Sequence, residues 1–311
     1  MRRTLGREVA FAGIGLHGGQ QVRLRIRPAE LGSGIVFLRS DIGPEHGLIP
    51  ARYDLVSDTR LCTRLANAHG ASVSTVEHVM AAIAAMGISD VMLEVDGPEV
   101  PIVDGSAQPF LAEMLRAGVR ELGVPRRAIR ILKPVTVTEG DRRAAILPAA
   151  RPEIAFTIEF DDPAIGQQSG EMALTGEAFL TDLADCRTFC QLSEVEMLRK
   201  IGLARGGGLE NAIVVDRGRV LNPEGLRRAD EFVRHKMLDA IGDLALAGAP
   251  IIGRYEGLKS GHGMTNALLR ALFEDPDAWE WVEADALTPP ASRVHDMALG
   301  ARDQTPAALA V

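Results

Sequence analysis

The sequence is poor in cysteine, in aromatic residues and in long apolar runs, and each shortage excludes a class of protein. Three cysteines among 311 residues are too few for a disulfide framework, which favours a reducing, cytoplasmic environment. Aromatic residues make up 4% of the chain, so aliphatic side chains and Met must form most of the core. The basic N-terminus is followed by no apolar segment typical of a signal peptide. The longest apolar stretches, residues 79–88 and 244–252, are much shorter than the roughly 20 residues of a membrane-spanning helix.

Basic charge is also in short supply. The chain has 34 Lys and Arg against 42 Asp and Glu, a net charge of −8, which argues against a general nucleic-acid-binding protein. Apolar residues at 46% and charged residues at 24% are typical of a folded globular protein. At roughly 150 residues a domain, the length predicts two domains. We therefore expect a soluble protein of two domains that has no nucleic-acid partner and no transmembrane segment.

Periodicity predicts that each half of the chain has strands first and helices afterwards. Alternating apolar residues predict strands in both halves, and apolar runs ended by glycine or a charged residue predict the helices. The expected strands cover residues 21–27, 35–38 and 89–95 in the first half, and 129–138, 144–147 and 154–160 in the second. The expected helices cover residues 75–86, 110–117, 223–247 and 266–273. This pattern predicts an α+β fold used twice.

A linker at residues 122–127, which contains Gly123 and Pro125, separates the two halves. We expect an N-terminal domain over residues 1–124, a C-terminal domain over residues 128–290 and a tail over residues 291–311. The glycine pattern at residues 13–18 matches G-x-G-x-x-G, but an alternating strand follows it where a dinucleotide site needs a helix. It is interpreted as a turn between strands.

One stretch of the long second-half helix carries a line of polar side chains. Spacings of four residues place His235, Asp239 and Asp243 on one helical face, while Met237, Leu238 and Ile241 make the rest of the helix look core-facing. A surface stripe with a His–Asp contact is one interpretation. The other is a metal site, in which imidazole and carboxylate ligands come from adjacent turns.

Two further histidines lie in suggestive surroundings. His78 follows Glu77 at the start of an apolar helix, where Ser74 and Glu77 match a capping box and His78 could be a satisfied core residue. His262 lies between Gly261 and Gly263, which would let a ligand approach closely or simply leave the histidine mobile on the surface. Taken together, His78, His235 and Asp239 are suitable ligands for a hydrolytic metal ion, with Glu77 as general base and His262 as a charged acid.

Five segments together resemble the UDP-3-O-acyl-N-acetylglucosamine deacetylase family, the zinc amidases that commit the lipid A pathway. The resemblance runs from about Gly13 to Phe273, and the segments that carry it are residues 72–78, 101–106, 187–189, 232–243 and 259–262. It implies two similar domains, each a β-sheet with packed helices, with the helices sandwiched between the sheets and the active site at the domain interface. It also implies a cytoplasmic enzyme of a Gram-negative-type bacterium that removes the N-acetyl group as acetate from its UDP-linked, 3-O-acylated sugar.

The resemblance also assigns roles to individual residues. His78, His235 and Asp239 would bind one catalytic Zn²⁺, although these ligands would also accept Fe²⁺. Glu77 would take a proton from the attacking water, and Thr188 would help to polarise the carbonyl and hold the oxyanion. His262, oriented by Asp243, would protonate the departing amine.

The remaining expectations concern the substrate. Lys236 and Lys259 are placed to meet the UDP phosphates, Phe189 to line the nucleotide or sugar site, and Cys62 to lie in a loop near the substrate, with a buried thiol as its alternative. A β-α-β insert at about residues 192–220 would form an apolar passage for the acyl chain, although an apolar helix and strand are more often core.

One residue departs from the family pattern, because Cys190 stands where the family usually has glycine. A zinc deacetylase of another N-acetyl sugar and an inactive homologue that binds UDP-sugar or acyl chains are the alternative functions. The chain is expected to act as a monomer.

Overall fold

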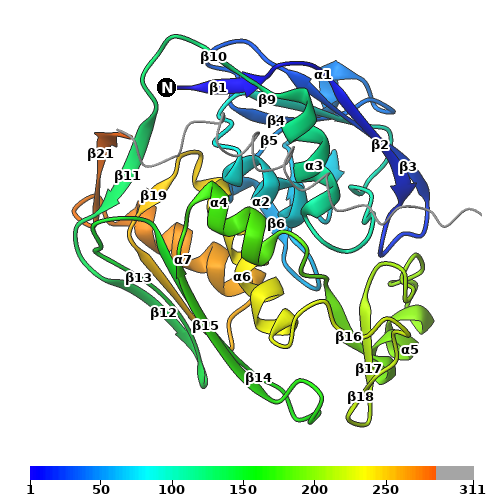
Figure 1. Ribbon diagram of the computed structural model, residues 1–311. Coiled ribbons are helices and arrows are strands. Elements are labelled where there is room, and N and C mark those ends of the chain that lie inside the picture. Colours follow the sequence, from blue (N-terminus) through cyan, green and yellow to red (C-terminus); the bar gives the residue numbers. More distant parts are fainter. Residues whose placement is uncertain (285–311) are drawn as a thin grey trace, which may run out of the picture.

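Two five-stranded sheets enclose a layer of helices in the computed structural model, which describes residues 1–284 (Figure 1). The first sheet has the order β2 (Val9–Ile14), β3 (Gln21–Pro28), β9 (Val91–Val95), β4 (Ile35–Arg39) and β5 (Leu48–Pro50). The second has the order β12 (Val135–Glu139), β13 (Arg142–Leu147), β20 (Arg254–Leu258), β14 (Glu153–Glu159) and β15 (Gln167–Ala173). This arrangement confirms the expected α+β class.

The two sheets share one topology, although the two halves of the sequence show no convincing residue-level repeat. In each sheet the strand that is last in the chain inserts between the second and the third. Strand β9 is antiparallel to β3 and parallel to β4, and β20 is likewise antiparallel to β13 and parallel to β14. The alternation of apolar residues that repeats in each half therefore corresponds to a repeated fold.

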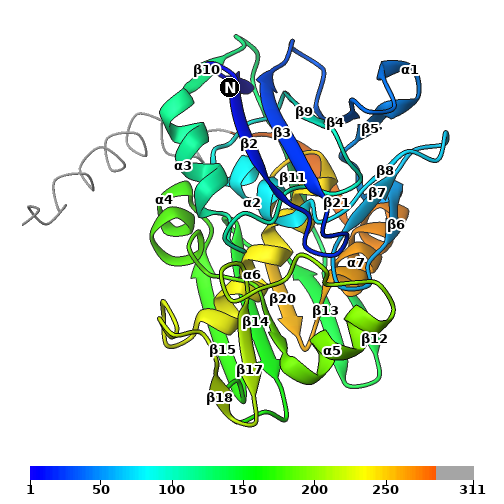
Figure 2. The same ribbon diagram turned by 90° about the vertical axis from the view of Figure 1, so that its right-hand side faces the viewer.

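The helices between the sheets are equivalent in the two halves. Helix α2 (Glu77–Ala85) precedes β9 and α3 (Gln108–Ala117) follows it, as α6 (Glu231–Leu244) precedes β20 and α7 (His262–Glu274) follows it. Helices α2 and α6 pack directly on each other at the centre of the molecule, between the two sheets (Figure 2). Nearly every residue of both helices is buried, because each is covered by a sheet and by the other helix.

Short strands complete the fold. β1 (Arg3–Leu5) pairs with β10 (Val119–Glu121), and β11 (Arg127–Ile131) pairs with β19 (Ile251–Ile252) and β21 (Trp279–Glu283). Each half also has a three-stranded insert before its central helix. In the first half it contains β6 (Val56–Asp58), β7 (Arg64–Ala66) and β8 (Ser72–Val73). In the second it contains β16 (Phe189–Gln191), β17 (Ile213–Asp216) and β18 (Arg219–Val220), with α5 (Leu192–Lys200) between β16 and β17.

The remaining helical segments are short: α1 (Pro44–Gly47), η1 (Tyr53–Leu55), α4 (Gly176–Ala178), η2 (Phe179–Leu183) and η3 (Ala245–Ala247). Within residues 1–284, no helix is both long and apolar enough to cross a bilayer. The proposed domain boundary at residues 124–128 follows β10 and includes the first two residues of β11. The expected tail at residues 291–311 and the end of the second expected domain lie outside the described residues.

Two predicted elements are wrong. The strand predicted over residues 129–138 is two strands in different sheets, because Pro134 interrupts the pairing between β11 and β12. The helix predicted from residue 223 begins only at Glu231. The Arg187 side chain holds the preceding turn, since its Nη2 donates to the Gly225 carbonyl at 2.7 Å and its Nε to Glu231 Oε1 at 2.9 Å. Gly225 has a φ of +70°, which is incompatible with a continuous helix.

Gly242 on α6 is the point at which the two central helices touch. A Cβ atom at this position would lie 2.0 Å from the Glu77 carbonyl oxygen of α2, so only glycine permits this approach. We predict that Gly242→Ala separates the helices and destabilises the protein by about 1–3 kcal/mol, the cost of overpacking a core. Urea unfolding measures the change.

The matched control is Gly261→Ala, because a Cβ at Gly261 meets no atom within 4 Å. Its expected unfolding midpoint is close to that of the parent protein. Equal midpoints for Gly242→Ala and the parent would contradict a close contact between α2 and α6.

Candidate metal centre

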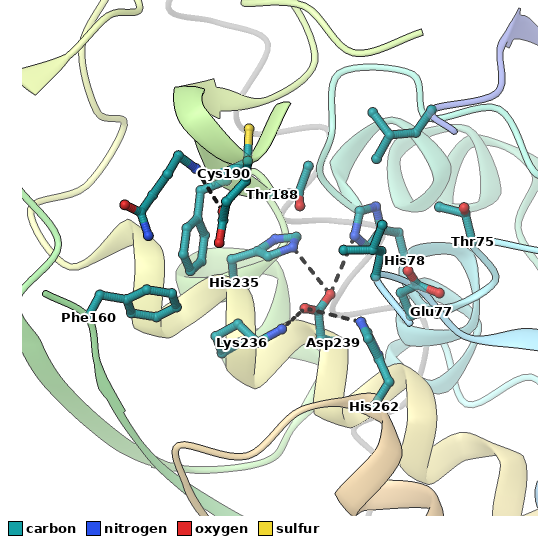
Figure 3. Close-up of a pocket in the computed structure, with 15 residues that line it drawn as sticks. Thr75, Glu77, His78, Phe160, Thr188, Cys190, His235, Lys236, Asp239 and His262 are labelled. Atoms are coloured by element: carbon teal, nitrogen blue, oxygen red, sulfur yellow. Dashed lines mark hydrogen bonds and ion pairs between the residues drawn. The ribbon is translucent and has the colours of Figure 1, made fainter. Parts of the chain in front are cut away.

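Three candidate ligands meet where α2 crosses α6. His78 lies on α2, and His235 and Asp239 lie one turn apart on α6. Their ligand atoms are all within 4.8 Å of one another. The Asp239 Oδ1 atom is 3.4 Å from His78 Nε2 and 3.2 Å from His235 Nε2, and the two imidazoles face this carboxylate (Figure 3). Both halves of the chain therefore contribute to one buried cluster.

The protonation of this cluster suits a cation. The His235 Nδ1 atom lies 3.0 Å from the Cys186 carbonyl oxygen, so Nδ1 carries the proton and Nε2 presents a lone pair. Burial lowers the pKa of His78 and so favours the neutral imidazole. Asp239 Oδ1 is buried and accepts no hydrogen bond from any residue in the described part of the chain. An imidazole lone pair facing a carboxylate oxygen is unfavourable until a positive ion lies between them, so these residues fit a divalent metal ion.

The charge of Asp239 is maintained despite its burial. Burial opposes the carboxylate form, but electrostatic interactions with His235 and Lys236 hold the pKa of Asp239 well below its usual range. Lys236 Nζ donates to Asp239 Oδ2 at 2.6 Å. The second carboxylate oxygen is therefore neutralised by lysine, while the first is directed at the two histidines.

Glu77 does not cap its helix, so the capping-box interpretation is wrong. The N-cap of α2 is Val76, and no side chain caps the helix. Instead Glu77 Oε2 accepts a hydrogen bond from the Thr63 backbone N–H at 3.0 Å, and the side chain lies at the edge of the metal cluster (Figure 3). Burial raises the pKa of Glu77 to about 7. A carboxylate with this pKa can accept and release a proton near neutral pH.

His262 is buried rather than mobile on the surface. It is the first residue of α7, and its Nδ1 lies 2.8 Å from Asp243 Oδ2. Burial opposes protonation of the imidazole, but the charges of Asp243, Glu77 and Asp239 prevail and raise its pKa to about 9. His262 Nε2 is 4.0 Å from Asp239 Oδ2, so a charged imidazole borders the candidate metal cluster.

A cavity of about 170 Å³ opens onto this cluster. Five of the residues predicted for catalysis or substrate binding line it: Glu77, Thr188, Phe189, Lys236 and His262. The three candidate ligands line it too. Cys190, the departure from the family pattern, also lines the cavity beside Thr188, and burial raises the pKa of its thiol to about 11.

Two predicted substrate contacts lie outside the cavity lining. Lys259 Nζ pairs with Asp141 at 2.8 Å and with Glu159 at 2.5 Å. Cys62 is a buried thiol, and burial raises its pKa far above the usual range. Asp243 is likewise absent from the lining and contacts the cavity through His262.

Sequence reasoning missed several residues around the cavity. Leu16, Leu61, Thr75 and Phe160 line it, although no role was predicted for any of these four residues. Thr63 also went unnoticed, yet it bonds both Glu77 and Asp243. Its only sequence signal was its place directly after Cys62 in the loop between β6 and β7.

The pKa of about 9 for His262 predicts a pH dependence of stability. Since the folded pKa lies above the unfolded value of about 6.5, the stabilising contribution of the His262–Asp243 pair is complete below pH 6.5. It is lost as the pH rises through 9. In metal-free protein, we expect His262→Gln to lower the unfolding free energy more at pH 6 than at pH 10, as urea titrations would measure.

NMR titration of the His262 imidazole in the same metal-free protein supplies the control, with a midpoint expected well above 6.5. Asp243→Asn is expected to lower that midpoint. A midpoint at or below 6.5 in the parent protein would refute the assigned charge.

The chain was also compared with known proteins. Residues 2–274 match the sequence profile of the family described as LpxC, UDP-3-O-acyl N-acetylglycosamine deacetylase. A UDP-3-O-acyl-N-acetylglucosamine deacetylase from Phenylobacterium zucineum is 53% identical over 278 residues, which cover 89% of this chain and 95% of that protein. The enzymes of that name from Actinobacillus succinogenes and a Geobacter species are each 47% identical over 282 residues. These matches cover 90% and 91% of this chain, and 92% of each relative. The chain belongs to the UDP-3-O-acyl-N-acetylglucosamine deacetylase family.

Proposed function

We propose that this protein hydrolyses the N-acetyl group of UDP-3-O-[(3R)-3-hydroxyacyl]-N-acetylglucosamine, the committed step of lipid A biosynthesis. The products are acetate and the UDP-linked 3-O-acyl-glucosamine. The observation that carries the proposal is the buried His78–His235–Asp239 cluster, with Glu77 and a charged His262 on its border. The family match over residues 2–274 supports the choice of substrate.

The metal ion would be held by His78, His235 and Asp239. When bound, such an ion acts as a Lewis acid and lowers the pKa of water to about 7. Zinc is our proposed ion, because two imidazoles and one carboxylate leave a coordination position open for chemistry. The same donor set accepts Fe²⁺.

The surrounding side chains divide the proton transfers between them. Glu77 accepts a proton from the water whose oxygen attacks the acetamide carbonyl carbon. The Thr188 hydroxyl, which lines the cavity, donates to the carbonyl oxygen as negative charge develops there. Protonated His262 then delivers its proton to the amine nitrogen as the C–N bond breaks. In the metal-free protein the pKa is about 7 for Glu77 and about 9 for His262, so a carboxylate and an imidazolium coexist between those values.

The rest of the substrate would extend from the cavity in two directions. Lys236 lines the cavity and is proposed to meet the diphosphate, with Phe189 beside the nucleotide or sugar. Phe189 makes an edge-on contact with Phe160, so an aromatic wall is already formed. The cavity also touches Cys190, Gln191 and Glu194, at the start of the β16–α5–β17 unit. This contact supports the proposal that the insert guides the acyl chain.

We further propose that the enzyme acts as a cytoplasmic monomer. One chain supplies every residue of the cavity and of the candidate metal centre. All three cysteines are free, as expected in a reducing compartment. The alternatives are a deacetylase of another N-acetyl sugar and an inactive binding homologue. The second would be expected to lack a ligand, the base or His262, and this chain has all of them.

Acetate release from the proposed substrate is the direct test. We predict turnover that stops on chelation, returns with added Zn²⁺ and is absent in His78→Ala. UDP-N-acetylglucosamine without an acyl chain serves as the control for substrate choice. A folded, metal-loaded protein that releases no acetate from the acylated substrate would overturn the proposal.

Glu77→Gln tests the general base while preserving the size of the side chain and its bond to the Thr63 N–H. Loss of a general base predicts that kcat falls by about 10²- to 10⁴-fold, while the bound metal stays stoichiometric. Glu113→Gln on the exposed part of α3 is the matched control and is expected to leave kcat unchanged. Full activity in Glu77→Gln would exclude this role.

Lys236 and Lys259 can be distinguished by their effects on KM. Lys236→Ala removes a cation that lines the cavity and pairs with one carboxylate, Asp239, at 2.6 Å, and we predict a KM raised by about tenfold or more. Lys259 would have to leave Asp141 and Glu159 to reach a phosphate, so Lys259→Ala is expected to raise KM less. A larger effect at Lys259 would place the diphosphate nearer to Lys259 than to Lys236.

A further inference from the structure

We infer that Thr63 is a positioning residue that connects the general base to the pair that supplies the acid. This inference rests on the proposed function for the roles of Glu77 and His262. It concerns a residue that is neither a candidate metal ligand nor part of the cavity lining.

Thr63 joins the two catalytic groups through an unbroken chain of buried hydrogen bonds. Its backbone N–H donates to Glu77 Oε2 at 3.0 Å, and its hydroxyl donates to Asp243 Oδ1 at 2.5 Å. The other oxygen of Asp243 lies 2.8 Å from His262 Nδ1. Thr63, Glu77, Asp243 and His262 are all buried, so water does not compete for these bonds.

The chain of bonds also crosses between the two halves of the molecule. Thr63 and Glu77 belong to the first half, whereas Asp243 on α6 and His262 on α7 belong to the second. Because Asp243 is bonded through both oxygens, the hydroxyl of Thr63 fixes the plane of the carboxylate that orients the imidazole. Without that hydroxyl, Asp243 Oδ1 would be a buried acceptor that lacks this donor. The Asp243 carboxylate could then rotate, and the His262 imidazole would rotate with it.

The backbone of Thr63 is itself held in place. Its carbonyl oxygen accepts a hydrogen bond from the N–H of Val76, the residue before Glu77, at 3.4 Å. Both the N–H and the carbonyl of Thr63 are therefore bonded to residues at the start of α2. Leu61, two residues earlier, has a φ of +71°, an uncommon conformation for a side chain of this size. The loop thus presents the Thr63 N–H to Glu77 and the Thr63 hydroxyl to Asp243.

The test compares Thr63→Val with Thr63→Ser. Valine keeps the shape and the N–H bond to Glu77 but removes the hydroxyl, and serine restores the donor. Misorientation of His262 predicts that kcat of Thr63→Val falls by about 10- to 100-fold, with KM and bound metal close to the parent values. Thr63→Ser should recover most of kcat. Thr4→Val, the same change at another buried threonine, is the control and should leave kcat unchanged.

Unchanged kcat in Thr63→Val, or an equal loss in Thr63→Ser, would overturn the inference. A second measurement does not depend on turnover, so it tests the inference about Thr63 separately from the proposed function. In metal-free protein, Thr63→Val and Asp243→Ala should have non-additive effects on the urea midpoint, because each removes one partner of the same hydrogen bond. If the parent releases no acetate while this coupling is present, the proposed function fails but the bond stands. Additive effects would show that the bond is not made.

Discussion

The contact between α2 and α6 is the constraint on which the site depends. Each helix is the central helix of its own half, and the two halves meet where Gly242 lies against the Glu77 carbonyl. This close approach brings His78 of one helix within reach of Asp239 on the other. Neither half alone contains all three candidate ligands. The site is therefore a consequence of how the repeated fold packs on itself.

Charge imposes the second requirement. Glu77, Asp239 and Asp243 are buried near one another, and three carboxylates in such a place repel and are poorly solvated. The protein supplies Lys236 beside Asp239 and a protonated His262 beside Asp243. One carboxylate oxygen, Asp239 Oδ1, still lacks a hydrogen-bond donor among residues 1–284, and it faces two imidazoles. A bound divalent ion would complete this balance.

The sequence predicted those parts of the molecule that local patterns determine. Spacing alone placed His235, Asp239 and Asp243 on one face of α6. The strand predictions located β3, β4 and β9 of the first sheet and β13 and β14 of the second, but not β2, β5, β15 or β20. Local patterns failed where distant residues decide the structure. The start of α6 depends on Arg187, which lies more than forty residues earlier. The role of Thr63 depends on Asp243, which is 180 residues away in the sequence. Similarly, only the fold shows that Lys259 is already paired with carboxylates.

The central claim is that His78, His235 and Asp239 hold one metal ion between α2 and α6. Anomalous X-ray scattering at the zinc edge, from crystals grown with one equivalent of Zn²⁺, tests it most directly. We predict a single strong peak at about 2.0–2.2 Å from one nitrogen of each histidine and from an Asp239 oxygen. A peak elsewhere, or none at this cluster in a zinc-loaded protein, would contradict the account.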